Sequence, residues 1–320
     1  MIYKQLGKAD ARISVIAMGG HEYLPTGASR GFNENFELAV TPGYIFDGFG
    51  QENRKNVLGA AFDNGINLFD VTHDSEKEAL GRNLKEMPPP YEIYVQTRPE
   101  GMVYTYDPYN AKMADFGLLK AEAQRILKLL QRETIDFFNL AFMRDALDHD
   151  PDYLAKISDN VARLKREGLI RFACADTFSG EETYLRQIEA GCFDVVYINY
   201  NFGDYGCERK VFPAAQAKGL GIISREAFMK GKLFAMVAEA GLTDRNRVAQ
   251  AALRWNLARP ETTSVVLGTG KVNHLLNSME ILQNLEMGPE DREIIEKIKQ
   301  TPTYREYEAA KLQEFLGEAK

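Results

Sequence analysis

The sequence predicts a single (β/α)8 barrel, and three observations support this fold class. Short apolar runs alternate with amphipathic segments along the chain, as they do in parallel strands joined by crossover helices. The alternation gives eight strand candidates, each followed by a helical region, which is the number that closes such a barrel. No linker rich in Pro, Gly or Ser divides the 320 residues, so we expect one domain over 1–320.

The expected strands are short apolar runs that end at polar or glycine residues. They lie at 13–20, 66–70, 92–98, 135–142, 170–176, 195–201, 221–227 and 263–270. The expected helices lie at 53–65, 75–86, 121–132, 157–168, 181–191, 208–219, in a region that runs to 260, and at 273–285. Gly65, Gly168, Gly191 and Gly219 stand where a helix must stop before the next strand, which supports this phasing.

Two segments lie outside the alternation. Residues 21–52 form an insertion in the first βα loop, and we expect it to reach over the barrel mouth as a lid. Residues 300–320 are expected to form a helical tail.

Composition limits the classes of partner. Lys and Arg total 39 against 46 for Asp and Glu, a net charge of -7 with no basic block, so nucleic acid is not an expected partner. No apolar run reaches the ~18 residues of a membrane span, and the amino terminus lacks the features of a secretory signal. The sequence therefore predicts a cytoplasmic protein that does not associate with membranes. Cys174, Cys192 and Cys207 lack metal-binding spacing and are expected to be buried, without a disulfide framework.

The candidate site lies at the carboxyl ends of the strands, where barrels of this class carry their chemistry. The residues at these ends are His21, Glu22, Asp70, His73, Arg98, Arg144, Asp176, Asn199, Asn201, Arg225, Glu226 and 268–271. This rim is rich in ionisable side chains, which favours a small, anionic substrate.

Asp70 and His73 are the first catalytic candidates. Asp70 is either a functional carboxylate or a polar strand end, and His73 is either an acid–base group or a solvated loop histidine. We expect His73 to lie near Asp70 and within reach of Arg98. His21 and Glu22 could join them around a metal ion, but the spacing matches no metal motif, so no metal site is expected.

Charged residues on other strands complete the prediction. Arg98 and Arg225 are expected to clamp a carboxylate or phosphate, although they could instead form an ion network with Asp176, Glu226 and Asp70. Glu226 is a candidate general base if burial raises its pKa. Tyrosines at 104, 106 and 109 could lean over the site, or they could be ordinary loop packing.

Several segments together resemble the aldo-keto reductase superfamily. GINLFD followed by SEKEALG is similar to the pattern G-I-N-x-F-D-T-A-x-x-Y-G-x-S-E-x-x-L-G, and LKREGLIRFACAD is similar to L-K-x-x-G-K-I-R-x-I-G-V-S-N. DVVYINYN and AALRWNLARPETTSVVLGTGKVNHLLNSM resemble the later cofactor-binding segments. The resemblance extends from residue 1 to about 290 and implies the barrel fold and a nicotinamide cofactor.

The resemblance also implies a catalytic tetrad of Asp, Tyr, Lys and His, of which only Asp70 is kept. The turn after Asp70 is shorter than the family pattern and contains no tyrosine, Arg98 replaces the Lys, and Ala141 replaces the His. Arginine keeps the positive charge but stays protonated and is planar, so it is not interchangeable with the lysine, which in the family lowers the pKa of the tyrosine. The sequence therefore predicts a degenerate tetrad.

The cofactor positions that the resemblance implies are altered at one end. Asp176 and Thr177 stand at the Ser-Asn pair that holds the carboxamide, Tyr197 stands at the glutamine, and Arg225 stands at the stacking tyrosine. The loop of Gly268, Thr269, Gly270 and Lys271 is expected to bind the cofactor phosphates at a helix start. His274 replaces the arginine that commonly binds the 2′-phosphate, so both NADP and NAD remain open.

Three functions are compatible with these residues. The first is an atypical NAD(P)(H)-binding oxidoreductase on a small carbonyl or sugar-like anionic substrate. The second is a redox-neutral lyase, dehydratase or isomerase on a small anionic substrate, which the ionic rim favours. The third is a non-catalytic barrel that has lost the chemistry, since a fold alone does not determine function.

Overall fold

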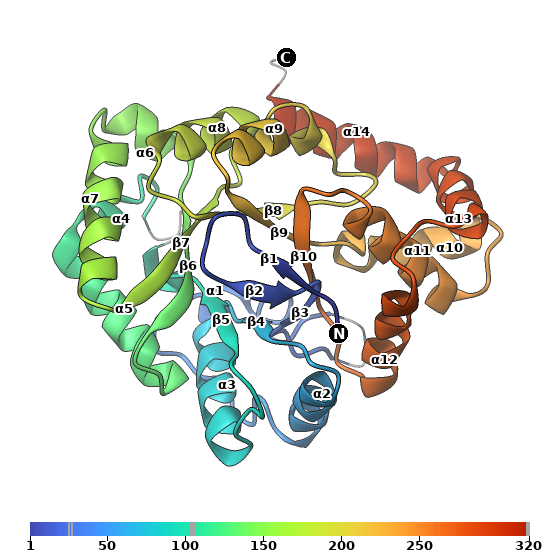
Figure 1. Ribbon diagram of the computed structural model, residues 1–320, viewed down its shortest axis with the longest axis horizontal. Coiled ribbons are helices and arrows are strands. Elements are labelled where there is room, and N and C mark those ends of the chain that lie inside the picture. Colours follow the sequence, from blue (N-terminus) through green and yellow to red (C-terminus); the bar gives the residue numbers. More distant parts are fainter. Residues whose placement is uncertain (25, 27, 103–106, 318–320) are drawn as a thin grey trace.

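The computed structural model describes residues 1–24, 26, 28–102 and 107–317. Eight parallel strands close into a barrel in the order β10-β3-β4-β5-β6-β7-β8-β9 (Figure 1). They are β3 (Ile16–Gly19), β4 (Leu68–Asp70), β5 (Tyr94–Thr97), β6 (Ile135–Ala141), β7 (Ile170–Asp176), β8 (Val195–Asn199), β9 (Gly221–Arg225) and β10 (Thr262–Leu267). Seven of these strands lie within their expected runs and β10 begins one residue before its run, so the predicted (β/α)8 class is confirmed.

A helix packs outside the barrel after each strand. These helices are α2 (Glu52–Asp63), α3 (Asp74–Glu86), α5 (Phe116–Leu130), α7 (Tyr153–Arg166), α8 (Glu181–Ala190), α9 (Val211–Ala217), α11 (Arg245–Leu257) and α12 (Val272–Met279). Loops and the tail add α1 (Phe36–Ala39), α4 (Ala111–Ala114), α6 (Arg144–His149), α10 (Lys232–Glu239), α13 (Pro289–Lys299), α14 (Pro302–Leu316), η1 (Glu100–Met102), η2 (Gly206–Glu208), η3 (Met229–Gly231) and η4 (Glu280–Gln283). The four predicted helix-ending glycines all have φ between 68° and 79°, the left-handed conformation that ends helices.

An antiparallel hairpin, β1 (Tyr3–Gln5) and β2 (Arg12–Ser14), lies in front of the barrel centre in Figure 1. The expected strand 13–20 is therefore divided between this hairpin and β3. Ser14 fixes the division, because its N–H bonds to Asn67 Oδ1 at 2.7 Å and its hydroxyl donates to the Ile16 carbonyl at 2.7 Å. The hairpin packs its apolar residues on the barrel interior, which it closes at the end opposite the strand carboxyl ends.

The insertion 21–52 packs against the start of α3. The Gly43 N–H bonds to Asp74 Oδ2 at 2.6 Å, and the Phe46 N–H bonds to the Ser75 hydroxyl at 2.8 Å. Gly50 lies so close to α3 that a Cβ at this position would be 2.4 Å from the Ala79 Cβ. Because α3 begins just after β4 ends, these contacts place the insertion at the same end of the barrel as Asp70.

The tail forms the predicted helix as α14, which lies along the same side of the barrel as α8 and α9 (Figure 1). The Tyr304 hydroxyl donates to the Phe202 carbonyl at 2.7 Å. A Cβ at Gly180 would be 2.3 Å from the Phe315 carbonyl oxygen, so the loop after β7 lies directly against α14. The helix therefore borders the carboxyl-end face of the barrel.

Candidate active site

Asp70 ends β4 and faces a tyrosine from the opposite wall of the barrel. The Tyr197 hydroxyl, from β8, donates to Asp70 Oδ2 at 2.5 Å. Burial raises the pKa of Asp70 to about 6, and the bond from Tyr197 opposes this rise. Burial also raises the pKa of Tyr197 well above its usual value, with Asp70 adding to the rise. The pair thus holds a protonated phenol against a carboxyl group whose pKa lies near neutrality.

Arg225 is bound to Asp176 by a bidentate ion pair. Its Nη1 and Nη2 donate to the two Asp176 oxygens at 2.7 and 2.8 Å, and its Nε donates to Asn199 Oδ1 at 2.6 Å. The guanidinium carbon lies 4.7 Å from the Tyr197 ring centroid and 5.2 Å from that of Phe178. The structure thus shows the ion-network alternative for Arg225, which uses three of its five N–H donors. The role of Arg225 as an anion clamp stays a prediction.

Asp176 is fully buried and accepts further bonds. Asn139 Nδ2 donates to Oδ2 at 2.9 Å, and the Tyr184 hydroxyl donates to Oδ1 at 3.1 Å. Thr177 Oγ1 accepts from the Ser179 N–H at 3.0 Å. The side chains that the resemblance assigns to a carboxamide are therefore committed to bonds within the protein.

Arg98 is likewise held by a carboxylate. Its Nε and Nη2 donate to Glu100 at 2.6 and 2.9 Å, and Glu100 is buried. Burial lowers the pKa of Arg98, but the charge and hydrogen bonding of Glu100, together with the charge of Asp176, outweigh burial, so the pKa is raised. An anion at Arg98 would therefore share the guanidinium with Glu100.

His73 is buried among the insertion's aromatic rings. Its ring centroid lies 5.2 Å from that of Phe32, 6.1 Å from that of Phe46 and 5.2 Å from that of Phe49. Its Nε2 lies 3.0 Å from Glu76 Oε1. Within the described residues, no hydrogen bond or ion pair joins His73 to Asp70 or Arg98. His73 is the N-cap residue of α3, so its side chain faces the residue three positions on, which is Glu76.

His21 is the histidine that interacts electrostatically with Asp70 and Arg98. Its Nδ1 lies 2.5 Å from Glu76 Oε1, and the Thr72 N–H donates to Glu76 Oε2 at 2.6 Å. Our sequence reasoning placed His21 on the rim but did not select Glu76. The sequence contains one signal for Glu76, because it lies three residues after His73 at the start of a predicted helix.

Glu226 directly follows the last residue of β9 and has a strained backbone conformation, with φ of 63°. Its Oε1 lies 3.2 Å from Lys230 Nζ, and its Oε2 is buried without a hydrogen-bond partner in the part of the chain that the structure describes. Its charge acts on Asp204 and on Lys311 of α14, so it faces the α14 side of the mouth. Its role as a general base stays a prediction.

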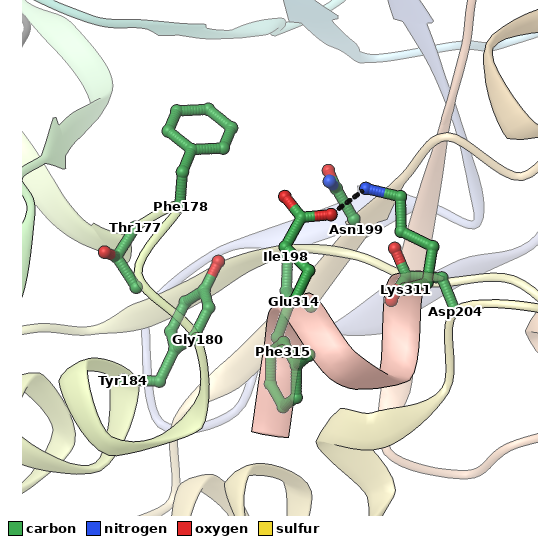
Figure 2. A pocket seen from close by; sticks show the side chains of 10 residues that line it. All are labelled: Thr177, Phe178, Gly180, Tyr184, Ile198, Asn199, Asp204, Lys311, Glu314 and Phe315. Atoms are coloured by element: carbon green, nitrogen blue, oxygen red, sulfur yellow. Dashed lines mark hydrogen bonds and ion pairs between the residues drawn. The ribbon is translucent and has the colours of Figure 1, made fainter. Parts of the chain in front are cut away.

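A small pocket lies between α14 and the loops after β7 and β8 (Figure 2). Lys311 Nζ bonds to Glu314 Oε2 at 2.6 Å beside Asn199 and Phe178 (Figure 2). Asp204 lies at the edge of this pocket. Burial raises the pKa of Asp204 to about 7, although the charge of Lys311 lowers it. Tyr104 and Tyr106 lie outside the described residues, while Tyr109 is exposed and stacks on His149.

The loop after β10 leads into α12 and is packed by the insertion. A Cβ at Gly268 would lie 2.0 Å from the Tyr23 hydroxyl oxygen, and one at Gly270 would lie 3.5 Å from the Tyr23 Cβ. The Lys271 N–H bonds to Thr269 Oγ1 at 3.3 Å, which shapes the turn. The predicted loop therefore opens a helix as expected, with Tyr23 directly over its glycines.

Among residues 1–24, 26, 28–102 and 107–317, no cluster of three or more His, Cys, Asp or Glu side chains could hold a metal ion. None of their helices combines the length and apolar character needed to cross a membrane.

Comparison with known proteins identifies the family. The family model of the aldo/keto reductase family matches residues 45–245, while no curated protein sequence matches the chain. Aldo-keto reductase AKR11C1 from Bacillus halodurans (holo form) is similar in structure, with a TM-score of 0.66 and 16% identity over 93% of this chain and 96% of that one. A proposed aldo-keto reductase from Pseudomonas aeruginosa has a TM-score of 0.60 and 19% identity over 88% of this chain and 95% of that one. These structural matches support the fold, and the family-model match over more than half of the sequence establishes that the chain belongs to the aldo/keto reductase family.

Proposed function

We propose that the protein is an atypical oxidoreductase that acts on a small carbonyl or sugar-like anionic substrate with NAD(P)(H). The observation that carries the proposal is the Asp70–Tyr197 pair, whose 2.5 Å hydrogen bond joins the carboxyl end of β4 to the middle of β8. Family membership supports the class of reaction. The ionic side chains around the pair support an anionic substrate.

The phosphate end of the site fits a nucleotide. Gly268 is exposed and Gly270 is half-buried in front of α12, whose first N–H groups and positive dipole end suit phosphate oxygens. Lys271 is exposed and adds a positive charge at this position. These residues, with Thr269, would hold the phosphates of NAD or NADP.

The nicotinamide end does not fit in the manner of the family. Asp176 already accepts from Arg225, Asn139 and Tyr184, so it offers no free oxygen. The Arg225 guanidinium lies 4.7 Å from the Tyr197 ring centroid and 5.2 Å from that of Phe178, and the resemblance places a stacking tyrosine at the position of Arg225. We therefore derive no step through the nicotinamide and assign only proton transfer to the protein.

Proton transfer requires a group that can both hold and release a proton near neutral pH. Asp70 meets this requirement because its pKa is about 6. Tyr197 keeps its proton and donates it in a hydrogen bond, which orients the Asp70 carboxylate. Arg98, with Glu100 behind it, is the proposed contact for the anionic group of the substrate.

A redox-neutral reaction on a small anionic substrate is the second candidate. The specific observation in its favour is the bidentate Arg225–Asp176 pair, which fills the place of the carboxamide contacts. Proton abstraction beside a carboxylate needs an acid–base pair and an anion contact, both of which the mouth provides.

Nucleotide binding and turnover separate these functions. Purified protein is titrated with NADPH and NADH by calorimetry, and then assayed with small anionic aldehydes and ketones. The proposal expects binding of one nucleotide and turnover that Asp70→Asn reduces by about 10²-fold or more. Turnover without any nucleotide would support the redox-neutral candidate. Absence of both binding and turnover would support a non-catalytic barrel.

A further inference from the structure

Glu76 is a carboxylate buried behind the catalytic mouth. Its side chain has no exposed surface, and it accepts from the Thr72 N–H at 2.6 Å. Gly20 makes room for it, because a Cβ at that position would lie 2.8 Å from Glu76 Oε2. A buried carboxylate is costly unless it is paired, and apolar residues often replace such groups without loss of stability. The fold thus builds a specific place for this charge.

Two imidazoles approach the same Glu76 oxygen. His21 Nδ1 lies 2.5 Å from Oε1, and His73 Nε2 lies 3.0 Å from it. The His73 ring is fully buried, whereas the His21 side chain is 36% exposed and is therefore the one that a substrate can reach. Because an ionised carboxylate only accepts, His21 must place its proton on Nδ1 to bond to it. The His21 Nε2 is then left to take or give a proton.

We infer that His21 is a second group, beside Asp70, that exchanges a proton with the substrate, and that Glu76 is the positioning residue that fixes the tautomer and orientation of His21. The inference rests on the proposed site and adds to it a histidine–carboxylate pair outside the family tetrad. The same arrangement of a carboxylate behind an imidazole orients the base in serine hydrolases. His73 approaches the same carboxylate from the side of the insertion, with its Nε2 3.0 Å from Glu76 Oε1.

The proton step balances within these groups. The Nε2–H bond of the His21 imidazolium breaks, an O–H bond forms on a substrate oxyanion, and His21 becomes neutral with Nδ1–H still bonded to Glu76. The reverse transfer makes His21 a base. The exposed part of the ring allows exchange of the proton with solvent.

The charged groups around His21 determine its proton affinity. Burial lowers the pKa of His21, but Glu76 outweighs burial and Asp70 adds to the rise, while Arg98 opposes it. His73, Arg54 and Tyr23 also face Glu76. Burial raises the pKa of Glu76, but His73 and His21 together hold it well below its usual value, so Glu76 stays ionised.

Nitrogen NMR of the imidazole side chains tests the inference without a substrate. The chain has only 4 histidines, so His21→Gln and His73→Gln assign the two signals. We expect neutral His21 to carry its proton on Nδ1 and to titrate above 6.5, its ordinary value. In Glu76→Gln, the pKa of His21 should fall by about one unit or more, because a neighbouring opposite charge typically contributes one to three units. Glu78→Gln, on the same helix but at a half-buried salt bridge to Arg82, is the matched control and should leave the pKa of His21 unchanged.

Two results would overturn the inference. One is a neutral His21 with its proton on Nε2, and the other is a His21 pKa that Glu76→Gln leaves unchanged. If Glu76→Gln does not fold, the tautomer of the wild-type protein still decides the point. Once a substrate is found, His21→Gln should lower kcat at least 10²-fold and leave nucleotide binding unchanged; full activity of this variant would refute the role. If the wild-type protein binds neither NADPH nor NADH, the proposed oxidoreductase function is contradicted, but the His21–Glu76 pairing is not.

Discussion

Asp176→Ala should be among the most destabilising single changes at the barrel mouth. The Asp176 carboxylate accepts two bonds from Arg225 at 2.7 and 2.8 Å, one from Asn139 and one from Tyr184. Asp176 is fully buried and the Arg225 side chain is only 15% exposed, so the substitution leaves a mostly buried cation without its partner. Breaking such a pair typically costs ~3–5 kcal/mol. At ~2 °C per kcal/mol for a chain of this size, Tm should fall by roughly 6–10 °C.

Thermal unfolding followed by circular dichroism measures the effect. Asp159→Ala, which removes an exposed partner of Arg163 at 3.6 Å, is the control and should change the free energy of unfolding by ~0–1 kcal/mol. The double variant Asp176→Leu with Arg225→Met replaces both charges by apolar groups and should recover most of the lost stability. A single variant as stable as the control would refute the buried ion pair.

Three further predictions concern the site. Asp70→Asn should raise Tm above pH 6 and leave it nearly unchanged at pH 4. Between pH 3.8 and about 6 the Asp70 carboxyl keeps its proton in the folded state but loses it in the unfolded state, so above this range the ionised carboxylate destabilises the folded wild-type protein and the variant removes that cost. An equal shift of Tm at both pH values would contradict the raised pKa. Gly268→Ala should cost ~1–3 kcal/mol in urea unfolding through the clash with Tyr23, and Tyr23→Phe should restore part of it, since the clashing hydroxyl oxygen is removed; additive effects would show that the two residues do not touch. Lys271→Ala should weaken NADPH or NADH binding about 10–100-fold in calorimetry, by loss of ~1.5–3 kcal/mol from a charged hydrogen bond, with Tm unchanged because the side chain is exposed; equal affinity would place the phosphates elsewhere.

The fold could be predicted because its signal is local. Each barrel strand is a short apolar run and a helix follows it, so the alternation is visible without any knowledge of strand pairing. The hairpin β1–β2 was missed as a separate unit because most of β2 and all of β3 lie within one continuous apolar run, 13–20. The division at Ser14 depends on a bond to Asn67, which is distant in sequence.

The site could be predicted only as a set of strand ends. That Asp70 lies on the rim follows from the phasing of β4, but its bond to Tyr197 joins opposite walls of the barrel and depends on side-chain reach across it. The same holds for Arg225 and Asp176, which lie on strands separated by β8. The orientation of His73 could have been anticipated, because an N-cap residue faces the third residue of its helix rather than the barrel axis.

The proposed role of Asp70 in a nucleotide-dependent reaction is tested most directly by the pH dependence of substrate turnover. Turnover is measured with and without NADPH or NADH, in wild-type protein and in Asp70→Asn. The account predicts that turnover of a small anionic carbonyl compound needs one of the nucleotides. It also predicts that activity changes with an apparent pKa near the value of about 6 held by Asp70, and that this transition is absent in the variant. Nucleotide-dependent turnover that Asp70→Asn leaves intact, or turnover that needs no nucleotide, would contradict it.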